Sequence, residues 1–374
     1  MDAQSDEPMT IAVIGPSRFP IREPYAGGLE VVVAKEVAAL RSRGHHVTLF
    51  AAAGSEGHDP RFEFTAMSGV AGFGDSFYPE GGYEADAAEF HRLMDHLADP
   101  RFDVILNHSL SHVPLIRAAD LDARMITTLH CPALAPMQDA FDQLGGLTGM
   151  VHAVSRSVLG SWRVPQGAEV IPNGVETRIW RPHPSSATAH TSPSGIPPRA
   201  VWCGRIVPEK APHLAVDAAL RAGMELDLAG RIGDDRYMSA VLAPRLRHAG
   251  DAVRFHGALG RESLVPLVAR ASVALVTPCW EEPFGLTAVE ALACGTPVVA
   301  LARGGIREIL RGQPGVVLVE PGRAPASALA AAVPVALTFD RAATARAAAA
   351  AFSHERRIDR VEARLRALPV GVAG

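Results

Sequence analysis

Two carboxylates separated by seven residues flank a turn and a short helical pattern in the C-terminal half of the chain. Glu282 lies just before Pro-Phe-Gly, and Glu290 lies within the apolar run Ala-Val-Glu-Ala-Leu-Ala. A charge inside an apolar helix costs free energy unless it is paired or reaches a wet cleft. Glu290 is therefore a candidate binding acid, with a solvated surface acid as the alternative. For Glu282 the alternative is a cap at the positive end of the helix dipole.

The turn between these acids is expected to begin a helix with free backbone N–H groups. Gly285 lets a ligand approach the backbone, and its neighbours in the turn are Phe284, Leu286 and Thr287. Because free N–H groups at a helix N-terminus attract anions, we expect an anion such as a phosphate here.

Two cations, Arg205 and Lys210, lie on one loop after the first strand expected in the C-terminal half. Arginine offers a bidentate fork and lysine a point charge, and together they suit a diphosphate. Taken alone, the Pro-Glu-Lys sequence of this loop is also typical of a solvated turn. The presence of both cations and both acids favours a phosphate site.

Candidate polar residues in the N-terminal half lie at helix starts and strand ends. Gly27 and Gly28 precede a helix whose amides are placed to receive a phosphate, although glycines in turns are more often geometric. Ligands of open α/β sheets bind beyond the carboxyl ends of strands. The polar residues at such ends are Asn107, His108, His130 and Ser155. A lone histidine there is more often structural, so imidazole chemistry makes His130 only a candidate.

Short apolar, β-branched runs alternate with helical patterns and predict two doubly wound parallel sheets. The strands expected in the N-terminal half are residues 10–15, 47–51, 103–107, 125–129, 150–154 and 169–172. Those expected in the C-terminal half are residues 200–204, 226–230, 253–257, 271–277, 297–301 and 315–319. Residues 182–198 are rich in Pro, Ser and Thr and predict an exposed linker, and the Ala-rich chain after Pro334 predicts helix.

The length, charge and composition of the chain limit the classes of protein to which it can belong. A chain of 374 residues has room for two domains, and a formal net charge of −4 argues against a nucleic-acid binder. No signal peptide or apolar run of membrane-spanning length is found, so we expect a cytoplasmic protein. No zinc-type pairing of histidines and cysteines is found, so no metal site is expected. The cysteines expected to be reduced and mostly buried are Cys131, Cys203, Cys279 and Cys294.

The Glu282-x7-Glu290 spacing around Pro-Phe-Gly resembles the E-x7-E motif of glycosyltransferase family 4. Gly-Arg-x4-Lys, which contains Arg205 and Lys210, matches a second family motif, and His130 in Thr-Leu-His matches a third. Gly-Gly-Leu-Glu from Gly27 is similar to the family loop near the donor diphosphate. This sequence and Trp-Glu-Glu-Pro-Phe-Gly-Leu look most similar to actinomycete enzymes that build sugar-containing antibiotics.

The resemblance implies a GT-B fold, in which two Rossmann-like domains face a cleft. Residues 1–181 with 353–374 would form the acceptor domain, and residues 182–352 the nucleotide-sugar domain. The last helix, beginning near Ser353, would cross back to the N-terminal domain. Ser155 and Asn173 also match the family, and Asn173 with Gly174 is expected to form a turn at a domain end.

The resemblance further implies a retaining transfer from a UDP- or GDP-linked sugar, without a divalent metal or another cofactor. Arg205, Lys210 and the amides of residues 284–287 would stabilise charge on the leaving diphosphate. Glu290 would hold the ribose hydroxyls, whereas Glu282 and His130 would contact the donor sugar. No protein general base is assigned, because the leaving phosphate can itself accept the acceptor's proton.

Three other classes of protein are open to this sequence. A non-hydrolysing sugar-nucleotide epimerase shares the architecture but needs acid and base groups on both sugar faces. A regulator on a transferase fold would have lost the site residues, which are all present. An NAD-dependent oxidoreductase is disfavoured because neither half carries G-x-G-x-x-G.

The acceptor is expected to be a small soluble polyol, amino sugar or thiol-bearing metabolite, with a lipid or polysaccharide as the alternative. Stable attachment to a membrane would need a basic patch. Here the cations of the helix over residues 29–43 are offset by Glu30 and Glu36. Residues 54–83 show little periodicity and are expected to be a surface excursion or an acceptor loop. The oligomeric state is left open.

Overall fold

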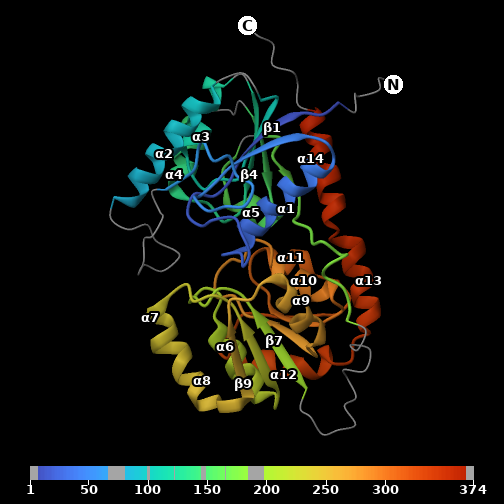
Figure 1. Cartoon of the computed structure of the whole chain (residues 1–374). Coiled ribbons are helices and arrows are strands. Elements are labelled where there is room, and N and C mark those ends of the chain that lie inside the picture. The colour runs from blue at the N-terminus through green and yellow to red at the C-terminus, as the bar shows by residue number, and fades with distance from the viewer. Residues whose placement is uncertain are drawn as a thin grey trace. The chain divides into compact units, whose positions relative to one another are not determined.

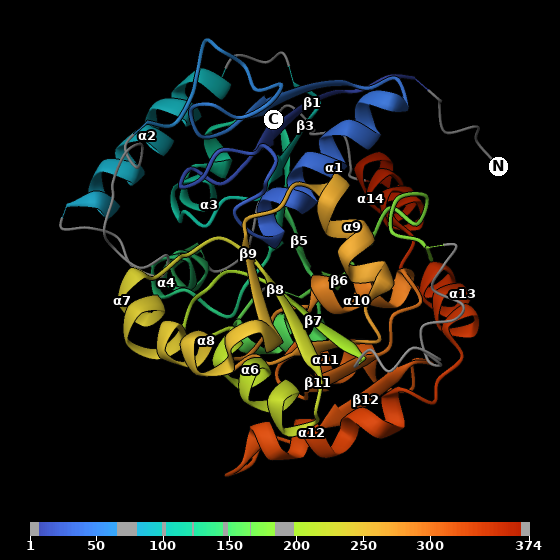
Figure 2. The ribbon, with the colours of Figure 1, turned by 60° about the horizontal axis from the view of Figure 1, so that its bottom comes forward.

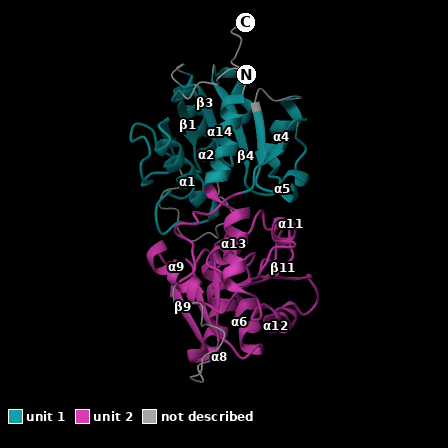
Figure 3. Ribbon diagram, turned by 90° about the vertical axis from the view of Figure 1, so that its right-hand side faces the viewer, with its two compact units in different colours: residues 1–71, 78–172, 355–374 teal, residues 72–77, 173–354 magenta. Residues whose placement is uncertain are grey.

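The computed structural model contains two compact units, drawn together in Figure 1 and coloured separately in Figure 3. It describes residues 7–65, 81–98, 102–121, 123–144, 149–164, 166–183 and 198–367. Of these, the residues up to 172 and from Glu355 onward form unit 1, and Asn173–His354 form unit 2. Most of the expected linker and part of the 54–83 segment lie outside the described residues.

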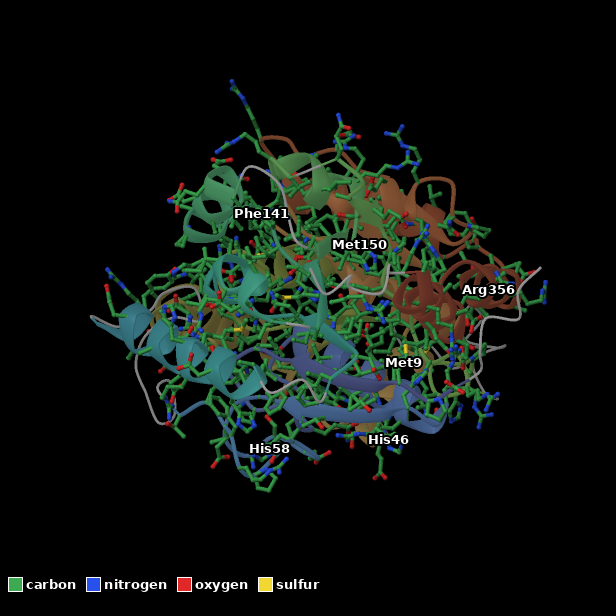
Figure 4. The ribbon with its side chains drawn as sticks, turned by 90° about the horizontal axis from the view of Figure 1, so that it is seen from above. Met9, His46, His58, Phe141, Met150 and Arg356 are labelled. Atoms are coloured by element: carbon green, nitrogen blue, oxygen red, sulfur yellow. The ribbon has the colours of Figure 1, made fainter. Side chains whose placement is uncertain are left out.

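Unit 1 is built on a six-stranded parallel sheet in the order β2-β1-β3-β4-β5-β6. Its strands are β1 (Thr10–Ile14), β2 (His46–Phe50), β3 (Val104–Asn107), β4 (Arg124–Leu129), β5 (Gly149–Ala153) and β6 (Glu169–Val170). Its helices are α1 (Gly28–Ser42), α2 (Gly82–Leu97), α3 (Val113–Ile116), α4 (Ala135–Leu144), α5 (Arg156–Ser161) and α14 (His354–Ala367). Next to the first strand pair, the N–H of His46 donates to the Met9 carbonyl at 2.9 Å; both residues are labelled in Figure 4.

Both faces of this sheet are buried, which explains why its strands are apolar without alternation. Along β1, Ile11 and Val13 pack into one core with residues of α1 and α14, whereas Ala12 and Ile14 pack into a second core with α2. Successive side chains of a strand point to opposite faces, so β1 contributes to both cores. This is the doubly wound arrangement that the sequence predicts.

The C-terminal helix α14 belongs to unit 1, as the resemblance implied, and Figure 2 shows it beside α1. Ile358, Val361 and Leu365 recur at helical spacing and are buried in the core that includes β1 and α1. Arg43, just after α1, bonds with Asp359 at 2.6 Å and Glu362 at 2.8 Å on α14. The apolar face of α14 therefore holds it in this position, with ion pairs at its edge.

Unit 2 repeats the architecture with strand order β12-β11-β10-β7-β8-β9, again all parallel. Its strands are β7 (Arg199–Cys203), β8 (Glu225–Ala229), β9 (Val253–Gly257), β10 (Val273–Val276), β11 (Val298–Leu301) and β12 (Val316–Val319). Its helices are α6 (Pro212–Arg221), α7 (Asp235–Tyr237), α8 (Ala243–Ala249), α9 (Arg261–Arg270), α10 (Leu286–Ala293), α11 (Gly305–Leu310), α12 (Pro325–Ala336) and α13 (Arg341–Ala351). The two sheets with their covering helices are the two Rossmann-like α/β halves that the resemblance to a GT-B fold implied.

One boundary differs from the expectation. The Ala-rich helical region starts at Pro325, before Pro334, and Pro334 lies within α12. Proline lacks an N–H and usually ends a helix, which is why the sequence suggested a helix only after it. Here α12 continues through Pro334 and ends two residues later, at Ala336.

Within the described ranges, no single helix combines the length and hydrophobicity needed to cross a bilayer. The pair α12 and α13, bent by 107° at its junction, meets that criterion only as a pair.

Truncating Ile358 tests how strongly α14 stabilises unit 1. This side chain is fully buried, and removing a buried Ile side chain to Ala typically costs about 2–5 kcal/mol. We expect Ile358→Ala to lower the free energy of unfolding of unit 1 by roughly that amount, measured by denaturant titration. Val335→Ala, which truncates a side chain that is 53% exposed, is the control and should change stability little. Equal stability of both variants would contradict this role of α14.

Candidate active site

Two loops of unit 2 are fastened together at the carboxyl ends of β7 and β10. Thr277 follows β10, accepts the indole N–H of Trp202 at 2.9 Å, and lies 3.0 Å from the carbonyl oxygens of Lys210 and Ala211. The N–H of Cys279 donates to the Glu209 carbonyl at 2.7 Å. These bonds hold the loop that carries Lys210 against the strand end.

A strained residue follows Lys210 directly. Ala211 has φ 48° and ψ 52°, the left-handed conformation, and is the one non-glycine residue with positive φ in the described part of the chain. Such strain persists only where the surroundings impose it. Ala211 is fully buried and is the N-cap of α6. The strained backbone conformation therefore lies in the turn directly after Lys210.

Lys210, Glu282 and Trp280 form one cluster. The Lys210 ammonium lies 2.5 Å from Glu282 Oε2 and 5.1 Å from the centre of the Trp280 ring, and the Trp280 indole donates to the same Oε2 at 2.9 Å. No side chain caps α10 by a hydrogen bond, so the alternative that Glu282 caps this helix in that way is wrong. Both bonds end on Oε2, which leaves Oε1 with no partner among the described residues.

A neighbouring turn fixes the backbone at Glu282. The N–H of Gly305 donates to the Glu282 carbonyl at 2.7 Å, and the N–H of Gly304 donates to the Glu281 carboxylate at 2.8 Å. A Cβ on Gly304 would lie 2.6 Å from the Glu282 carbonyl oxygen, so only glycine fits this approach. The acid is therefore held through its main chain as well as its side chain.

The turn after Glu282 begins α10 as expected. Gly285 is its N-cap with φ 85°, and a Cβ there would lie 2.8 Å from Ile306. The N–H groups of Leu286 and Thr287 are the first of the helix, so they have no carbonyl partner within it. The Phe284 ring is buried edge-on against Phe352, with ring centres 6.4 Å apart.

Glu290 lies in the middle of α10 and is 8% exposed, so the surface-acid alternative is wrong. No hydrogen bond or ion pair joins it to any described residue. Burial raises its pKa to about 8, from 4.5 for an ordinary glutamate. At neutral pH Glu290 is therefore largely a neutral carboxylic acid, which both donates and accepts hydrogen bonds.

Arg205 lies on the same loop as Lys210 and is partly exposed. Its guanidinium is 3.8 Å from the carboxylate of Glu209, which follows four residues later on the same loop. In unit 2 the structure thus joins Lys210 directly to Glu282, and places Arg205 on the fastened loop that carries Lys210.

In unit 1, His130 lies just beyond β4 and is partly exposed. Its Nε2 is 2.9 Å from His108 Nδ1, and His108 Nε2 is 3.0 Å from Glu36 on α1. Burial is the largest cause that holds the pKa of His130 well below its usual range. His130 is therefore a neutral imidazole at neutral pH.

The Glu36 carboxylate is paired at its other oxygen with Arg357 of α14. Burial opposes ionisation of Glu36, but Arg357 and His108 outweigh it and hold its pKa well below the usual range. The expectation that Glu30 and Glu36 offset surface cations is wrong, because these side chains are buried, at 5% and 1% exposed. Gly27 is the N-cap of α1 and Gly28 its first residue, as expected.

Two other strand-end candidates are structural. Asn107 is fully buried and donates to Thr127 at 3.3 Å, while its carbonyl oxygen accepts from Ser109. Ser155 is fully buried and caps α5 by accepting the N–H of Val158 at 3.1 Å. Neither side chain is presented to a ligand.

At the turn expected from Asn173 and Gly174, a Cβ on Gly174 would lie 2.7 Å from His354 Cα. The chain therefore passes closely over itself at this turn, where unit 2 begins at Asn173 and ends at His354. Only glycine allows that approach.

The cysteines are free thiols, but only Cys294 is buried, so the expectation of mostly buried thiols is wrong. Cys131 and Cys203 are partly exposed and Cys279 is exposed, because three of the four lie in or beside strand-end loops. In the part of the chain that the structure describes, no group of three or more His, Cys, Asp or Glu side chains is arranged to hold a metal ion.

Sequence reasoning missed Trp280 and Thr277, which fasten the Lys210 cluster, and Glu36 and Arg357, which support His130. A signal existed for Glu36, because it lies among Val33, Val37 and Leu40 on the buried face of α1. No signal identified its partner, which lies 321 positions away.

Comparisons with known proteins agree with this architecture. A family model described as Glycosyltransferase Family 4 matches residues 26–179, and one described as Glycosyl transferases group 1 matches residues 197–338. A D-inositol 3-phosphate glycosyltransferase of Xylanimonas cellulosilytica is 30% identical over 358 residues, which cover 83% of this chain and 84% of the relative.

Three solved structures are similar across nearly the whole chain. Sucrose-phosphate synthase from Thermosynechococcus elongatus has a TM-score of 0.75 at 22% identity, covering 96% of this chain and 99% of that one. HepE of Anabaena in complex with UDP-glucose has a TM-score of 0.73 at 19% identity, covering 96% and 100%. AviGT4, a glycosyltransferase involved in avilamycin A biosynthesis, has a TM-score of 0.66 at 22% identity, covering 98% and 99%. At these identities the likeness concerns the fold.

The raised pKa of Glu290 predicts how stability depends on pH. Between pH 4.5 and about 8 the folded unit retains a proton that the unfolded chain has lost, so stability falls as pH rises through this window. Glu290→Gln removes this dependence while conserving shape. We expect the melting temperature of the wild type relative to Glu290→Gln to be highest near pH 5 and to decrease toward pH 8. Parallel melting curves of the two proteins across this range would contradict the assignment.

Proposed function

Because the chain belongs to glycosyltransferase family 4, we propose that it moves a sugar from a nucleotide diphosphosugar to a small soluble acceptor, with retention at the anomeric carbon. The observation that carries this proposal is the Lys210–Glu282–Trp280 cluster beside the start of α10. Lys210 and the N-terminus of α10 can bind the diphosphate of a nucleotide sugar. The free oxygen of Glu282, beside them, can accept a hydrogen bond from a sugar hydroxyl.

The leaving diphosphate gains negative charge as the glycosidic bond breaks. In this proposal, Arg205, Lys210 and the first N–H groups of α10 are preorganised donors for that charge. The loop bonds of Thr277 and the turn at Ala211 hold Lys210 in place before the donor binds. Since these groups offset the charge, the proposed reaction uses no divalent metal and no other cofactor.

The two acids have different parts. Glu282 keeps Oε2 on Lys210 and Trp280 and offers Oε1 to a hydroxyl of the donor sugar. Glu290, neutral and without a protein partner in the described residues, receives the two ribose hydroxyls. His130 contacts the donor sugar, and Gly27 with Gly28 at the start of α1 admits the phosphates. The departing phosphate takes the acceptor's proton.

The donor is UDP- or GDP-linked in this proposal, and the UDP-glucose complex of HepE supports a UDP sugar. For the acceptor, the Xylanimonas relative is named for an inositol phosphate, which favours a phosphorylated polyol. An acceptor from antibiotic biosynthesis is the second candidate, favoured by the Gly-Gly-Leu-Glu and Trp-Glu-Glu-Pro-Phe-Gly-Leu sequences and by the likeness to AviGT4.

Removing either cation tests the leaving-group role. We expect Arg205→Ala and Lys210→Ala each to lower kcat/KM by roughly 10²-fold, the usual effect of losing one preorganised donor. Release of nucleoside diphosphate from the donor is the measurement, with circular dichroism as the check on folding. Arg221→Ala removes an exposed cation of α6 and should retain turnover. A Lys210→Ala or Arg205→Ala enzyme with wild-type kcat/KM would remove that residue from the site.

Binding of the bare nucleotide separates the two acids. A thermal-shift screen of UDP, GDP and ADP first identifies the nucleotide, because a ligand that binds only the folded protein stabilises it. Calorimetry should then show Glu290→Gln weakening that nucleotide about tenfold, which corresponds to about 1.4 kcal/mol. Glu282→Gln should leave nucleotide affinity unchanged and reduce sugar transfer. An equal loss of nucleotide affinity in both variants would show that the roles are divided wrongly.

A further inference from the structure

Three buried polar side chains of unit 1, which we call the Glu36 network, have no part in the reaction as proposed. They are Glu36 of α1, His108 after β3 and Arg357 of α14, and they are 1%, 0% and 5% exposed. Arg357 pairs with one oxygen of Glu36, and His108 Nε2 lies 3.0 Å from the other. The network ends at His130, whose Nε2 is 2.9 Å from His108 Nδ1.

The direction of each hydrogen bond follows from charge. An ionised Glu36 only accepts hydrogen bonds, so the proton facing it is on His108 Nε2. Arg357 already balances this carboxylate, so a second buried cation at His108 would have no anion left to compensate it. His108 is then a neutral imidazole whose Nδ1 carries a lone pair, and the bond between the two histidines must be donated by His130 Nε2.

We propose that the Glu36 network fixes His130 as the Nε2–H tautomer, so that its Nδ1 lone pair faces the ligand as a hydrogen-bond acceptor. His130 Nδ1 has no partner among the described residues, and the side chain is partly exposed. Glu36, His108 and Arg357 are positioning residues for it. As far as the ligand is concerned, the inference rests on the proposed function, in which a donor sugar meets His130.

This tautomer sets the chemical class of sugar. A lone pair on Nδ1 accepts a hydrogen bond from a hydroxyl, whereas it has no proton to offer to a carboxylate or phosphate oxygen. A neutral hexose is therefore favoured over a hexuronic acid, in which a carboxylate replaces the hydroxymethyl group. This preference arises from the tautomer that the Glu36 network imposes on His130, and it does not depend on the size of the site.

Nitrogen NMR of the full chain labelled with ¹⁵N-histidine reads the tautomer directly. In the wild type near pH 7.5, with His130→Ala used to assign the signals, we expect His130 protonated on Nε2 and unprotonated on Nδ1. The same pattern is expected for His108. A proton on His130 Nδ1, in either the other tautomer or the imidazolium, would overturn the proposal without any variant having to fold.

Matched variants then test whether the network is responsible. Glu36→Gln replaces an obligate acceptor by an amide that also donates, so the protonation pattern of His130 should become mixed. Arg43→Ala removes the ion pairs that Arg43, just after α1, makes to Asp359 and Glu362 of α14, and it leaves the network intact. The Arg43→Ala protein should keep the wild-type tautomer. Loss of the tautomer in both variants would assign the effect to docking of α14 alone and overturn the role of Glu36.

Ligand discrimination provides the second readout. Calorimetry with a nucleotide hexose and the matching nucleotide hexuronic acid should show a preference for the hexose of about tenfold or more in the wild type and Arg43→Ala. The preference should largely disappear in His130→Ala and Glu36→Gln, while affinity for the bare nucleotide is retained. A wild type that binds the uronic acid equally well or better would overturn the inference about the sugar.

Failure of the inference and failure of the proposed function give different results. If no nucleotide sugar binds although His130 has the expected tautomer, the proposed function and the sugar class fall together and the tautomer assignment stands. If nucleotide sugars bind and His130 carries its proton on Nδ1, the Glu36 network proposal falls and the transferase proposal stands.

Discussion

Unit 1 depends on the pairing of Glu36 with Arg357. A carboxylate that is 1% exposed is strongly destabilising unless a cation and hydrogen bonds compensate it, and breaking such a pair leaves an uncompensated buried charge. Arg357 lies on α14, whose neighbouring residue Arg356 is exposed (Figure 4). The apolar face of α14 therefore positions the arginine that compensates the buried carboxylate of α1.

Unit 2 also contains acids that are removed from solvent, but their charges are compensated differently from that of Glu36. Lys210 and Glu282 remain partly exposed, so their pairing costs less desolvation and leaves one carboxylate oxygen available. Glu290 has no cation to compensate it, and burial raises its pKa instead. The same residue type is thus ionised where an arginine accompanies it and largely protonated where none does.

The sequence was informative wherever short-range pattern determines structure. Buried apolar runs identified the strands of both sheets, and Gly285 with the apolar spacing after it identified α10. Pairings across the fold were not readable. Glu282 was given a helix-cap alternative because its bonds to Lys210 depend on how two loops meet, and Glu36 was counted as a surface charge although its apolar neighbours on the helix indicated burial. The strain at Ala211 likewise arises from tertiary contacts and has no local sequence signal.

The place of α14 in the chain has a consequence for biosynthesis. Most of unit 1 leaves the ribosome first, yet its final helix is synthesised only after Asn173–His354, the segment that forms unit 2 among the described residues. During translation Glu36 therefore has no arginine partner, and the first core lacks the apolar face of α14. The described residues of unit 2 are therefore all synthesised before the last segment of unit 1, although unit 1 begins first. A nascent or truncated N-terminal fragment exposes an open apolar surface and an unpaired acid, which makes it a natural substrate for chaperones and proteases.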